Sequence, residues 1–169
     1  MPQTASRRAD AAALRRLWAP WRSVFLTHSK PRGCFLCASV RARPVQGHHV
    51  MAKGRQAFVI LNRYPYNNGH VMIAPVRHVG RLERLQPTEW LEMLALSQRV
   101  LKRLNRRLHP QGYNLGFNLG RAGGAGVPGH LHLHIVPRWN GDTNFMPVLG
   151  QTKVISQSLD VLSRLLKGL

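Results

Sequence analysis

Two short apolar runs predict a pair of neighbouring β-strands. Residues 57–61 read Ala-Phe-Val-Ile-Leu and residues 70–74 read His-Val-Met-Ile-Ala, and both runs are rich in side chains that favour strands. Residues 64–69 read Tyr-Pro-Tyr-Asn-Asn-Gly, a composition that is typical of turns. We therefore expect two antiparallel strands joined by a long loop.

The spacing of apolar residues changes to that of a helix over residues 88–108. Thr88 fits the N-cap position, and Glu89 and Glu92 suit the positive end of the helix dipole. Pro110 and Gly112 end the helix. An apolar stripe along this helix is expected to pack in the core, and its members are Trp90, Leu91, Leu94, Val100, Leu101, Leu104 and Leu108.

The remaining patterns predict two further strands and a last helix. We expect strands over residues 113–119 and 130–137, joined by a glycine-rich loop over residues 120–129, and a helix over residues 155–168. Nearer the start of the chain, Gly33 introduces Cys-Phe-Leu-Cys at residues 34–37, which we interpret as a tight knuckle. Strands followed by a helix and then by more strands indicate an α+β fold with an antiparallel sheet.

The charge of the chain is strongly positive, with 25 Lys and Arg against 6 Asp and Glu in 169 residues. Such a surface favours polyanions, including nucleotides and nucleic acid, although a solvated basic surface without a partner is the alternative. No apolar run is long enough to span a membrane. No apolar stretch follows the basic N-terminus, so we expect no secretory signal, no membrane contact and a cytoplasmic location.

Three histidines, His130, His132 and His134, alternate with aliphatic residues in the predicted fourth strand. Because a strand has a period of two, the histidines share one face and the aliphatic residues share the other, which we expect to pack against the helix. Imidazoles need hydrogen-bond partners, so a histidine face calls for a cleft, a metal or a ligand. Three interpretations are open: a solvated edge strand, a three-histidine metal site, and covalent catalysis in which one imidazole attacks phosphorus.

The loop before the histidines favours covalent catalysis. Residues 120–129 hold five glycines and one proline, and such a loop lets backbone N–H groups approach an anion closely. A glycine loop alone is a weak signal. A glycine loop that runs directly into His-x-His-x-His is much more specific.

At this point the sequence resembles the histidine-triad (HIT) family. Residues 129–138, Gly-His-Leu-His-Leu-His-Ile-Val-Pro-Arg, resemble the family signature, residues 62–71 resemble its first nucleotide-binding block, and residues 118–120 resemble its Asn-x-Gly segment. These blocks cover roughly residues 34–150 in the family's order. Residues 18–22 and 138–145 are similar to the branch that contains bacterial diadenosine tetraphosphate phosphorylases.

The resemblance implies a HIT-like fold, with an antiparallel sheet of about five strands, one long helix and a C-terminal helix. It divides the chain into an N-terminal extension (1–32), a HIT domain (33–150) and a C-terminal helix packed on the domain (151–169). Family members commonly dimerise through the long helix and the adjacent strand, so we expect a homodimer.

The resemblance also implies a role for each motif residue. His132 would attack the α-phosphate and form a nucleotidyl-histidine, which water or inorganic phosphate would then displace. The carbonyl of His130 would hold one ring nitrogen of His132 as N–H. His70 and His134 would donate hydrogen bonds to phosphate oxygens. The expected substrate-binding residues are Asn62 at the ribose and, at the phosphates, Asn118, Gly123, Gly124, Gly126 and Gly129.

The chain departs from the family pattern at Gly126 and Val127. Many members have Gln followed by Ser or Thr at these positions, where the side chains contact the leaving group. This chain is therefore not expected to make that contact, and the site has room for a larger or second phosphate ligand.

The two cysteines are spaced Cys-x-x-Cys, and a stable disulfide is improbable in the cytosol, which leaves a metal site or a redox pair. Zinc-bearing relatives and the similar galactose-phosphate uridylyltransferases take ligands from matching positions. The resemblance therefore implies a structural zinc site made of Cys34, Cys37, His78 and His130. The alternative is two reduced thiols and an unrelated His78. No organic cofactor is expected.

Together these observations predict an enzyme that cleaves an adenylylated substrate at its α-phosphate, and diadenosine tetraphosphate is the substrate we favour. Inorganic phosphate or water would be the second nucleophile. The alternatives are a hydrolase of AMP-lysine, another phosphoramidate or adenylylated DNA, and a non-enzymatic nucleotide-binding module. A nucleic-acid partner fits the charge but is not favoured, because the triad is intact.

Overall fold

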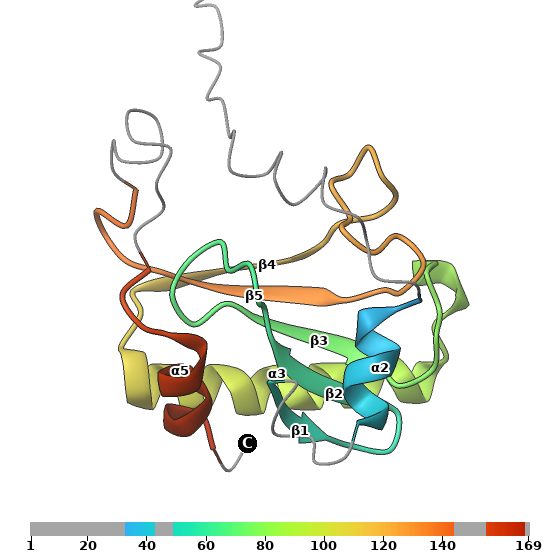
Figure 1. Cartoon of the computed structure of the whole chain (residues 1–169), viewed down its shortest axis with the longest axis horizontal. Coiled ribbons are helices and arrows are strands. Elements are labelled where there is room, and N and C mark those ends of the chain that lie inside the picture. Colours follow the sequence, from blue (N-terminus) through green and yellow to red (C-terminus); the bar gives the residue numbers. More distant parts are fainter. Residues whose placement is uncertain (1–32, 43–48, 144–154, 168–169) are drawn as a thin grey trace, which may run out of the picture.

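The fold is an antiparallel sheet with a long helix on one face (Figure 1). The structure is a computed structural model, and it describes residues 33–42, 49–143 and 155–167. The five strands lie in the order β1-β2-β3-β5-β4. They are β1 (Val50–Lys53), β2 (Ala57–Leu61), β3 (Val71–Pro75), β4 (Gly112–Phe117) and β5 (Leu133–Arg138). The helices are α2 (Phe35–Arg41), the 3-10 turn η2 (Leu82–Arg84), α3 (Pro87–Leu108) and α5 (Leu159–Leu165). The α+β class expected from the sequence is confirmed.

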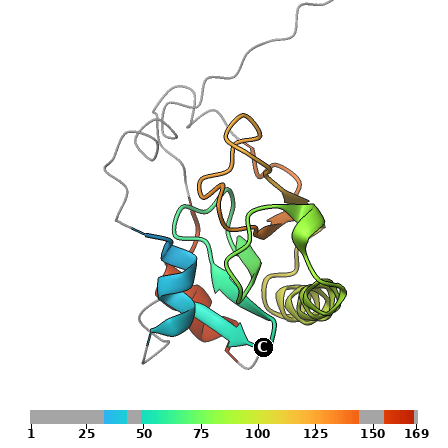
Figure 2. The ribbon, with the colours of Figure 1, turned by 90° about the vertical axis from the view of Figure 1, so that its right-hand side faces the viewer.

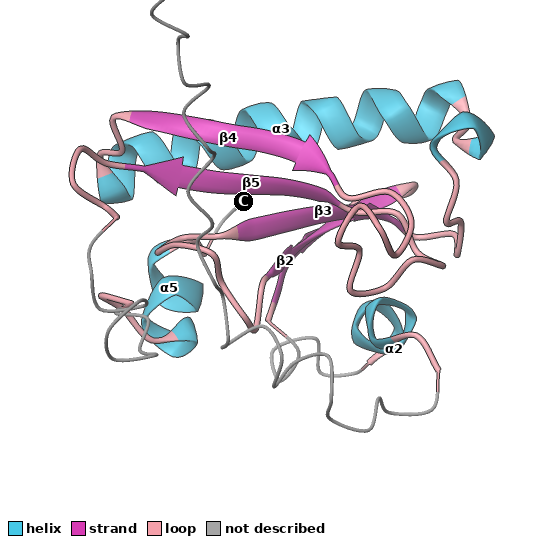
Figure 3. Cartoon of the chain, turned by 90° about the horizontal axis from the view of Figure 1, so that it is seen from above, coloured by secondary structure: helices cyan, strands magenta, loops and turns pink. Residues whose placement is uncertain are grey.

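Helices α3 and α2 lie on opposite faces of the sheet (Figures 2 and 3). The α3 face holds the main core, in which Val100 and Leu104 of the helix pack with Leu133 and Ile135 of β5. This confirms that the aliphatic side of the histidine segment faces the long helix. Helix α5 adds Leu162 to the same cluster. On the other face, α2 forms a smaller cluster with β2 and β3, whose members are Leu36, Val40, Phe58, Ile60, Met72 and Ala74.

This arrangement leaves the β4–β5 half of the α2 face for the functional site. Helix α2 lies toward one end of the sheet and α5 toward the other (Figures 1 and 3). The loop between β2 and β3 lies at the same end as the C-terminal half of β5, because the side chain of Asn67 donates a hydrogen bond to the carbonyl of Pro137. The glycine-rich loop lies at the opposite end of β5.

The long helix differs from the prediction at its start and along its apolar stripe. It begins at Pro87, with Gln86 rather than Thr88 at the N-cap. Proline at the first helical position loses no hydrogen bond. The Glu89 carboxylate also accepts from the Gln86 N–H at 2.9 Å, which stabilises this start. Leu91 and Leu94 were expected in the core but are 67% and 52% exposed. The buried stripe is instead Met93, Leu96, Ser97, Val100 and Leu104.

The histidine segment is only partly a strand. The prediction placed the strand over residues 130–137, but β5 begins at Leu133, so His130 and His132 precede it. The chain ahead of β5 leaves the partner strand: the ladder between β3 and β5 stops at the pair Ile73 and Leu133, although β3 itself continues to Pro75. The backbone ahead of β5 bonds elsewhere, with the Leu131 N–H donating to the Val79 carbonyl at 2.7 Å.

The cysteine segment is a helix rather than a tight knuckle. Cys34 occupies the N-cap of α2, and Cys37 lies in its first turn. The helix forms because Leu36 and Val40, four residues apart, share one face and are both buried. Strand β1 was not predicted. The expected extension 1–32 and the boundary at residue 150 lie outside the described residues, and no described helix is long and apolar enough to cross a membrane.

Candidate active site and metal centre

The ring of His132 is oriented by a backbone carbonyl. Its Nδ1 lies 2.8 Å from the carbonyl oxygen of His130, and because a carbonyl can only accept, Nδ1 carries the proton. The lone pair is therefore on Nε2 in the neutral ring. The residue is buried, with 7% of its surface exposed. Burial lowers the pKa of His132, while the hydrogen bond to His130 raises it and does not outweigh the burial, so the ring is neutral at neutral pH.

A second chain of hydrogen bonds orients His70 and His134. The Tyr66 N–H donates to Nδ1 of His70 at 2.9 Å, so His70 carries its proton on Nε2. That nitrogen lies 2.9 Å from Nδ1 of His134 and donates to it. His134 therefore carries its own proton on Nε2 when neutral. The His132 and His134 rings meet edge to face, with centroids 4.8 Å apart. The ring with a free lone pair on Nε2 (His132) therefore lies beside the ring with an N–H on Nε2 (His134).

The phenol of Tyr66 covers this histidine pair. Its ring stacks on His134 with centroids 5.4 Å apart and an interplanar angle of 22°, and it contacts the His70 ring at 4.6 Å. The Tyr66 hydroxyl accepts from the Asn118 side chain at 3.4 Å. Asn118, predicted to bind phosphate, thus lies at the histidine face. Asn62, predicted at the ribose, has Nδ2 3.3 Å from Nδ1 of His70.

Two cysteines and two histidines from three segments converge near the N-terminus of α2. The ligand atoms of Cys34, Cys37, His78 and His130 all lie within 4.8 Å of one another. The Sγ of Cys37 lies 3.3 Å from Nδ1 of His78, and the Sγ of Cys34 lies 3.3 Å from Nδ1 of His130. These four residues are the ones that the sequence predicted, and together they could hold a metal ion.

The donor atoms of this cluster are set up by their surroundings. Nε2 of His130 donates to the carbonyl of Pro75 at 2.8 Å, so its Nδ1 lone pair faces the thiols, as in metal sites where an outer group fixes the imidazole tautomer. Burial, opposed by the Pro75 hydrogen bond, lowers the pKa of His130 to about 4. Burial and the neighbouring Cys34 raise the pKa of the Cys37 thiol, so a metal has to displace its proton.

His130 belongs to the metal cluster and also orients His132, the candidate nucleophile. The His130 side chain belongs to the cluster, while its carbonyl orients His132. A metal that holds the His130 ring therefore also restrains the peptide group that sets the His132 tautomer. The same region is tightly packed: a Cβ on Gly80 would lie 2.7 Å from the carbonyl oxygen of Pro128, and a Cβ on Gly129 would lie 3.4 Å from Nε2 of His78.

The predicted glycines fall into two groups. Gly123 and Gly124 belong to a compact turn in which the Gly124 N–H donates to the Arg121 carbonyl at 3.0 Å, and Gly124 has a φ of 82°. A Cβ on Gly123 would lie 2.3 Å from the Leu119 carbonyl oxygen, so the turn requires glycine there. Gly126 follows this turn, whereas Gly129 lies beside the metal cluster. None of the four lines the cavities described next.

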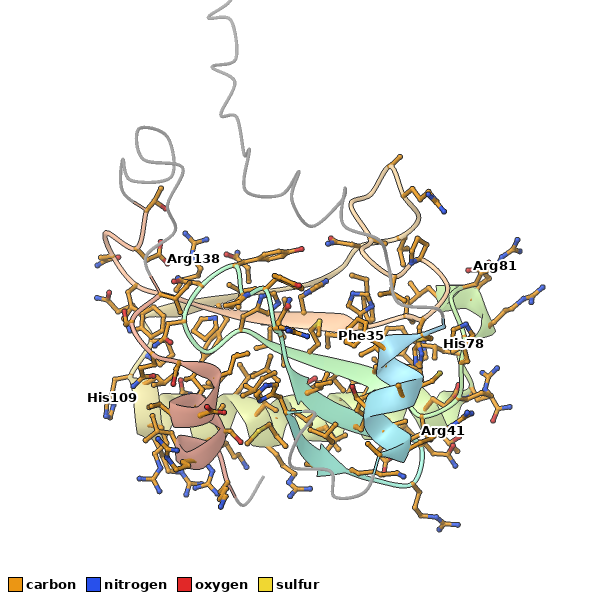
Figure 4. The ribbon with its side chains drawn as sticks, viewed as in Figure 1. Phe35, Arg41, His78, Arg81, His109 and Arg138 are labelled. Atoms are coloured by element: carbon orange, nitrogen blue, oxygen red, sulfur yellow. The ribbon has the colours of Figure 1, made fainter. Side chains whose placement is uncertain are left out.

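Two adjoining cavities follow the β4–β5 half of the sheet. The first has a volume of about 180 Å³ and is lined by His134, Asn118 and Gly116 among others. The second, of about 270 Å³, is lined by Arg138 and Asp142 among others. Three residues line both: Tyr66, Asn114 and Val136. Arg138 and His78 mark opposite ends of the sheet (Figure 4), so the groove runs away from the metal cluster.

Sequence reasoning missed several residues of this groove. Tyr66 was assigned to the first nucleotide-binding block as part of a turn, Asp142 to the segment that resembles the phosphorylase branch, and Asn114 to a strand, but none was assigned to the site. A signal existed for Asn114, because the strand period places it on the same face as Asn118. No sequence pattern places the loop residue Tyr66 over the histidines.

Comparison with known proteins identifies the family. Residues 43–141 match the family described as "HIT domain". This chain belongs to the HIT domain family. It is 37% identical over 161 residues to AP-4-A phosphorylase of Mycobacterium tuberculosis strain H37Rv, a match that covers 90% of this chain and 83% of that protein.

More distant HIT proteins agree in sequence and in fold. The chain is 30% identical over 96 residues to the asymmetrical bis(5'-nucleosyl)-tetraphosphatase of Schizosaccharomyces pombe, covering 57% of this chain and 52% of that protein. Its fold matches a Zn-bound histidine triad family protein from Mycobacterium smegmatis with a TM-score of 0.64 and 27% identity, over 80% of this chain and 91% of that one. The HIT-like fold expected from the sequence is confirmed.

Proposed function

We propose that this HIT enzyme cleaves diadenosine tetraphosphate at an α-phosphate through a covalent adenylyl group on His132. The observation that carries the proposal is the hydrogen bond between His132 Nδ1 and the His130 carbonyl at 2.8 Å. It leaves Nε2 as the nucleophile, next to the donor ring of His134. The similarity to AP-4-A phosphorylase of Mycobacterium tuberculosis supports the choice of substrate.

Each bond that forms or breaks in the proposed reaction can be assigned to residues of this chain and its substrate. Nε2 of His132 attacks the α-phosphorus, a P–N bond forms, and the bond to the bridging oxygen breaks, which releases ATP. The proposed role of His134 Nε2–H, backed by His70 and the Tyr66 N–H, is to donate to a phosphate oxygen as charge develops there. A polyphosphate is a good leaving group, so no strong general acid is required. Asn118 and the loop of residues 120–129 would hold the non-bridging oxygens of the α-phosphate.

The second nucleophile decides between phosphorolysis and hydrolysis. If an oxygen of inorganic phosphate attacks the adenylyl group, the P–N bond breaks and ADP forms; if water attacks, AMP forms. We propose phosphate, on the similarity to the phosphorylase. Purified protein with diadenosine tetraphosphate should yield ADP and ATP only when phosphate is added. AMP and ATP formed at the same rate with and without phosphate would reject phosphorolysis.

We propose zinc as the metal held by Cys34, Cys37, His78 and His130. Ligand atoms of a tetrahedral site with two thiolates and two imidazoles stand about 3.3 to 3.8 Å apart, given the usual zinc–sulfur and zinc–nitrogen bond lengths. Three of the pairs fit this spacing, since His130 Nδ1 lies 3.3 and 3.5 Å from the two sulfurs and His78 Nδ1 lies 3.3 Å from Cys37 Sγ; all four atoms lie within 4.8 Å of one another. With four protein ligands the metal has a structural role, which is to hold the His130 peptide that orients His132.

We also propose a homodimer through α3 and the edge strand β4. The misassigned leucines support it: Leu91 and Leu94 of α3 are exposed, as are Leu115 and Leu119 of the β4 segment. The helix and the strand are joined beside them, since the Trp90 and Phe117 rings meet edge to face at 5.6 Å. Such a run of exposed apolar side chains marks an interaction surface.

A further inference from the structure

The groove that starts at His134 ends in a cavity for which the proposed chemistry has no use. This cavity measures about 270 Å³ and is bounded by Tyr66, Asn114, Val136 and Arg138. Arg138 is four residues beyond His134 on the same face of β5, a distance of about 13 Å at the usual rise of a strand. A group bound there is too far from His132 to be the reacting phosphate, but it is within reach of the far end of an extended substrate.

The charge of the cavity argues against a phosphate as its occupant. Asp142 accepts from Nε and Nη2 of Arg138, at 2.6 and 2.8 Å, so the one cation among the described lining residues is paired with a carboxylate. The third guanidinium nitrogen, Nη1, donates to Oδ1 of Asn114 at 2.7 Å. An anion would have to break these bonds and would meet the Asp142 charge. A neutral ligand would not.

The shape and chemistry of the lining suit a flat heterocycle. Arg138 is held by three hydrogen bonds, so its planar guanidinium offers a fixed stacking surface, and the Tyr66 ring and the Val136 side chain supply apolar contacts. Because Oδ1 of Asn114 already accepts from Arg138, its amide can offer Nδ2 as a donor to a ring nitrogen or an exocyclic oxygen. Aromatic and guanidinium planes with a few polar groups are the usual means of holding a nucleobase.

We propose that this cavity binds the nucleobase of the leaving nucleotide. The proposal rests on the proposed function and deepens it: the adenylyl group that is transferred lies at His132 and Asn62, and the distal nucleoside extends along β5 to Tyr66, Asn114 and Arg138. The site would then distinguish a dinucleoside polyphosphate from a mononucleotide polyphosphate. Asn114 and Val136 are specificity-determining residues in this account, because both line the cavity proposed for the distal base.

The test compares two substrates that share the transferred group. Diadenosine tetraphosphate releases ATP, whereas adenosine 5'-tetraphosphate releases triphosphate and has no distal base. The quantity measured is the ratio of kcat/KM for the first compound to kcat/KM for the second. Asn114→Ala removes the amide donor, and Val136→Phe fills the cavity. Asn140→Ala is the matched control, because Asn140 lies nearby in the turn after β5 and does not line the cavity.

In the parent protein the ratio should exceed one. It should fall roughly fivefold in Asn114→Ala, as for the loss of one hydrogen bond, and about tenfold or more in Val136→Phe, as for the loss of base stacking, while Asn140→Ala should keep the parent ratio. Equal ratios in all four proteins would overturn the subsite and leave the proposed function standing. If the parent cleaved neither compound, the proposed function would fail and the subsite with it.

Discussion

Replacing Asp142 with alanine should loosen the loop that carries Tyr66 and His70. The Asp142 carboxylate accepts from two nitrogens of Arg138, from the Trp139 N–H at 3.1 Å and from Asn67 Nδ2 at 2.8 Å. It therefore ties the β2–β3 loop to the end of β5, and so holds the two histidine-bearing segments together. Without it, the Tyr66–His70–His134 chain loses an anchor.

The magnitude follows from how exposed each partner is. The Asp142 side chain is 9% exposed, whereas Arg138 is 44% exposed, so Arg138 can return to water and its ion pair contributes at most about 1 kcal/mol. Asn67 keeps its bond to the Pro137 carbonyl and loses one bond of about 1 kcal/mol. Allowing a few tenths more for the Trp139 N–H, we expect Asp142→Ala to lower the free energy of unfolding by about 2 kcal/mol.

The assay is chemical denaturation at several pH values. The Arg138 hydrogen bonds hold the pKa of the Asp142 carboxyl well below its usual value. A group whose pKa is lower in the folded state stabilises the fold above its unfolded-state pKa of about 3.9. The difference between parent and Asp142→Ala should therefore be constant from pH 5 to pH 8, and it should shrink as the pH falls below about 4.

The control is Glu83→Ala, which removes the same negative charge from a basic protein. The Glu83 side chain is 70% exposed and its oxygen lies 4.0 Å from Arg81, so we expect a change within about 0.5 kcal/mol. Asp142→Asn keeps one acceptor oxygen and should fall between parent and Asp142→Ala. Equal stability of Asp142→Ala and Glu83→Ala would refute the stabilising role of Asp142. So would a difference between parent and Asp142→Ala that grows on acidification.

Three further outcomes follow from the structure. Cys37→Ser should lose the proposed zinc, measured by elemental analysis of the purified protein. It should lower kcat for diadenosine tetraphosphate more than it raises KM, because His130 loses its anchor. Full activity of metal-free protein would contradict this. Leu94→Glu should shift the protein from dimer to monomer in analytical ultracentrifugation, whereas Arg99→Glu, exposed on another side of α3, should not. Glu89→Ala should destabilise the fold at pH 7 but much less near pH 3, because hydrogen bonds from Arg77 lower the pKa of the Glu89 carboxyl; an equal loss at both pH values would count against it.

Some of the site could be predicted from the sequence because its chemistry is local. The alternation of His132 and His134 with aliphatic residues predicted one face toward α3, and Leu133 and Ile135 do pack there. The Cys-x-x-Cys pair, with His78 and His130, converges as the family resemblance implied. The first feature depends on short-range periodicity, whereas the second joins three distant segments and rests on the family resemblance.

Other features depend on contacts that no local pattern specifies. The apolar residues of α3 form more than one stripe, and periodicity alone cannot tell whether Met93 or Leu94 faces the sheet. The start of β5 was placed three residues too early, because the Leu131 N–H bonds to the Val79 carbonyl rather than to β3. Tyr66 reaches the histidines from a loop that Asn67 anchors to the Pro137 carbonyl and to Asp142.

The most direct test of the account is intact-mass spectrometry during turnover of diadenosine tetraphosphate. Parent protein quenched without added phosphate should carry one adenylyl group, and phosphate should discharge it as ADP. His132→Asn keeps a polar side chain of similar size but has no ring nitrogen, and it should show no adduct and no turnover. An adenylyl adduct on His132→Asn, or parent-level turnover by this variant, would contradict the assignment of His132 as the nucleophile.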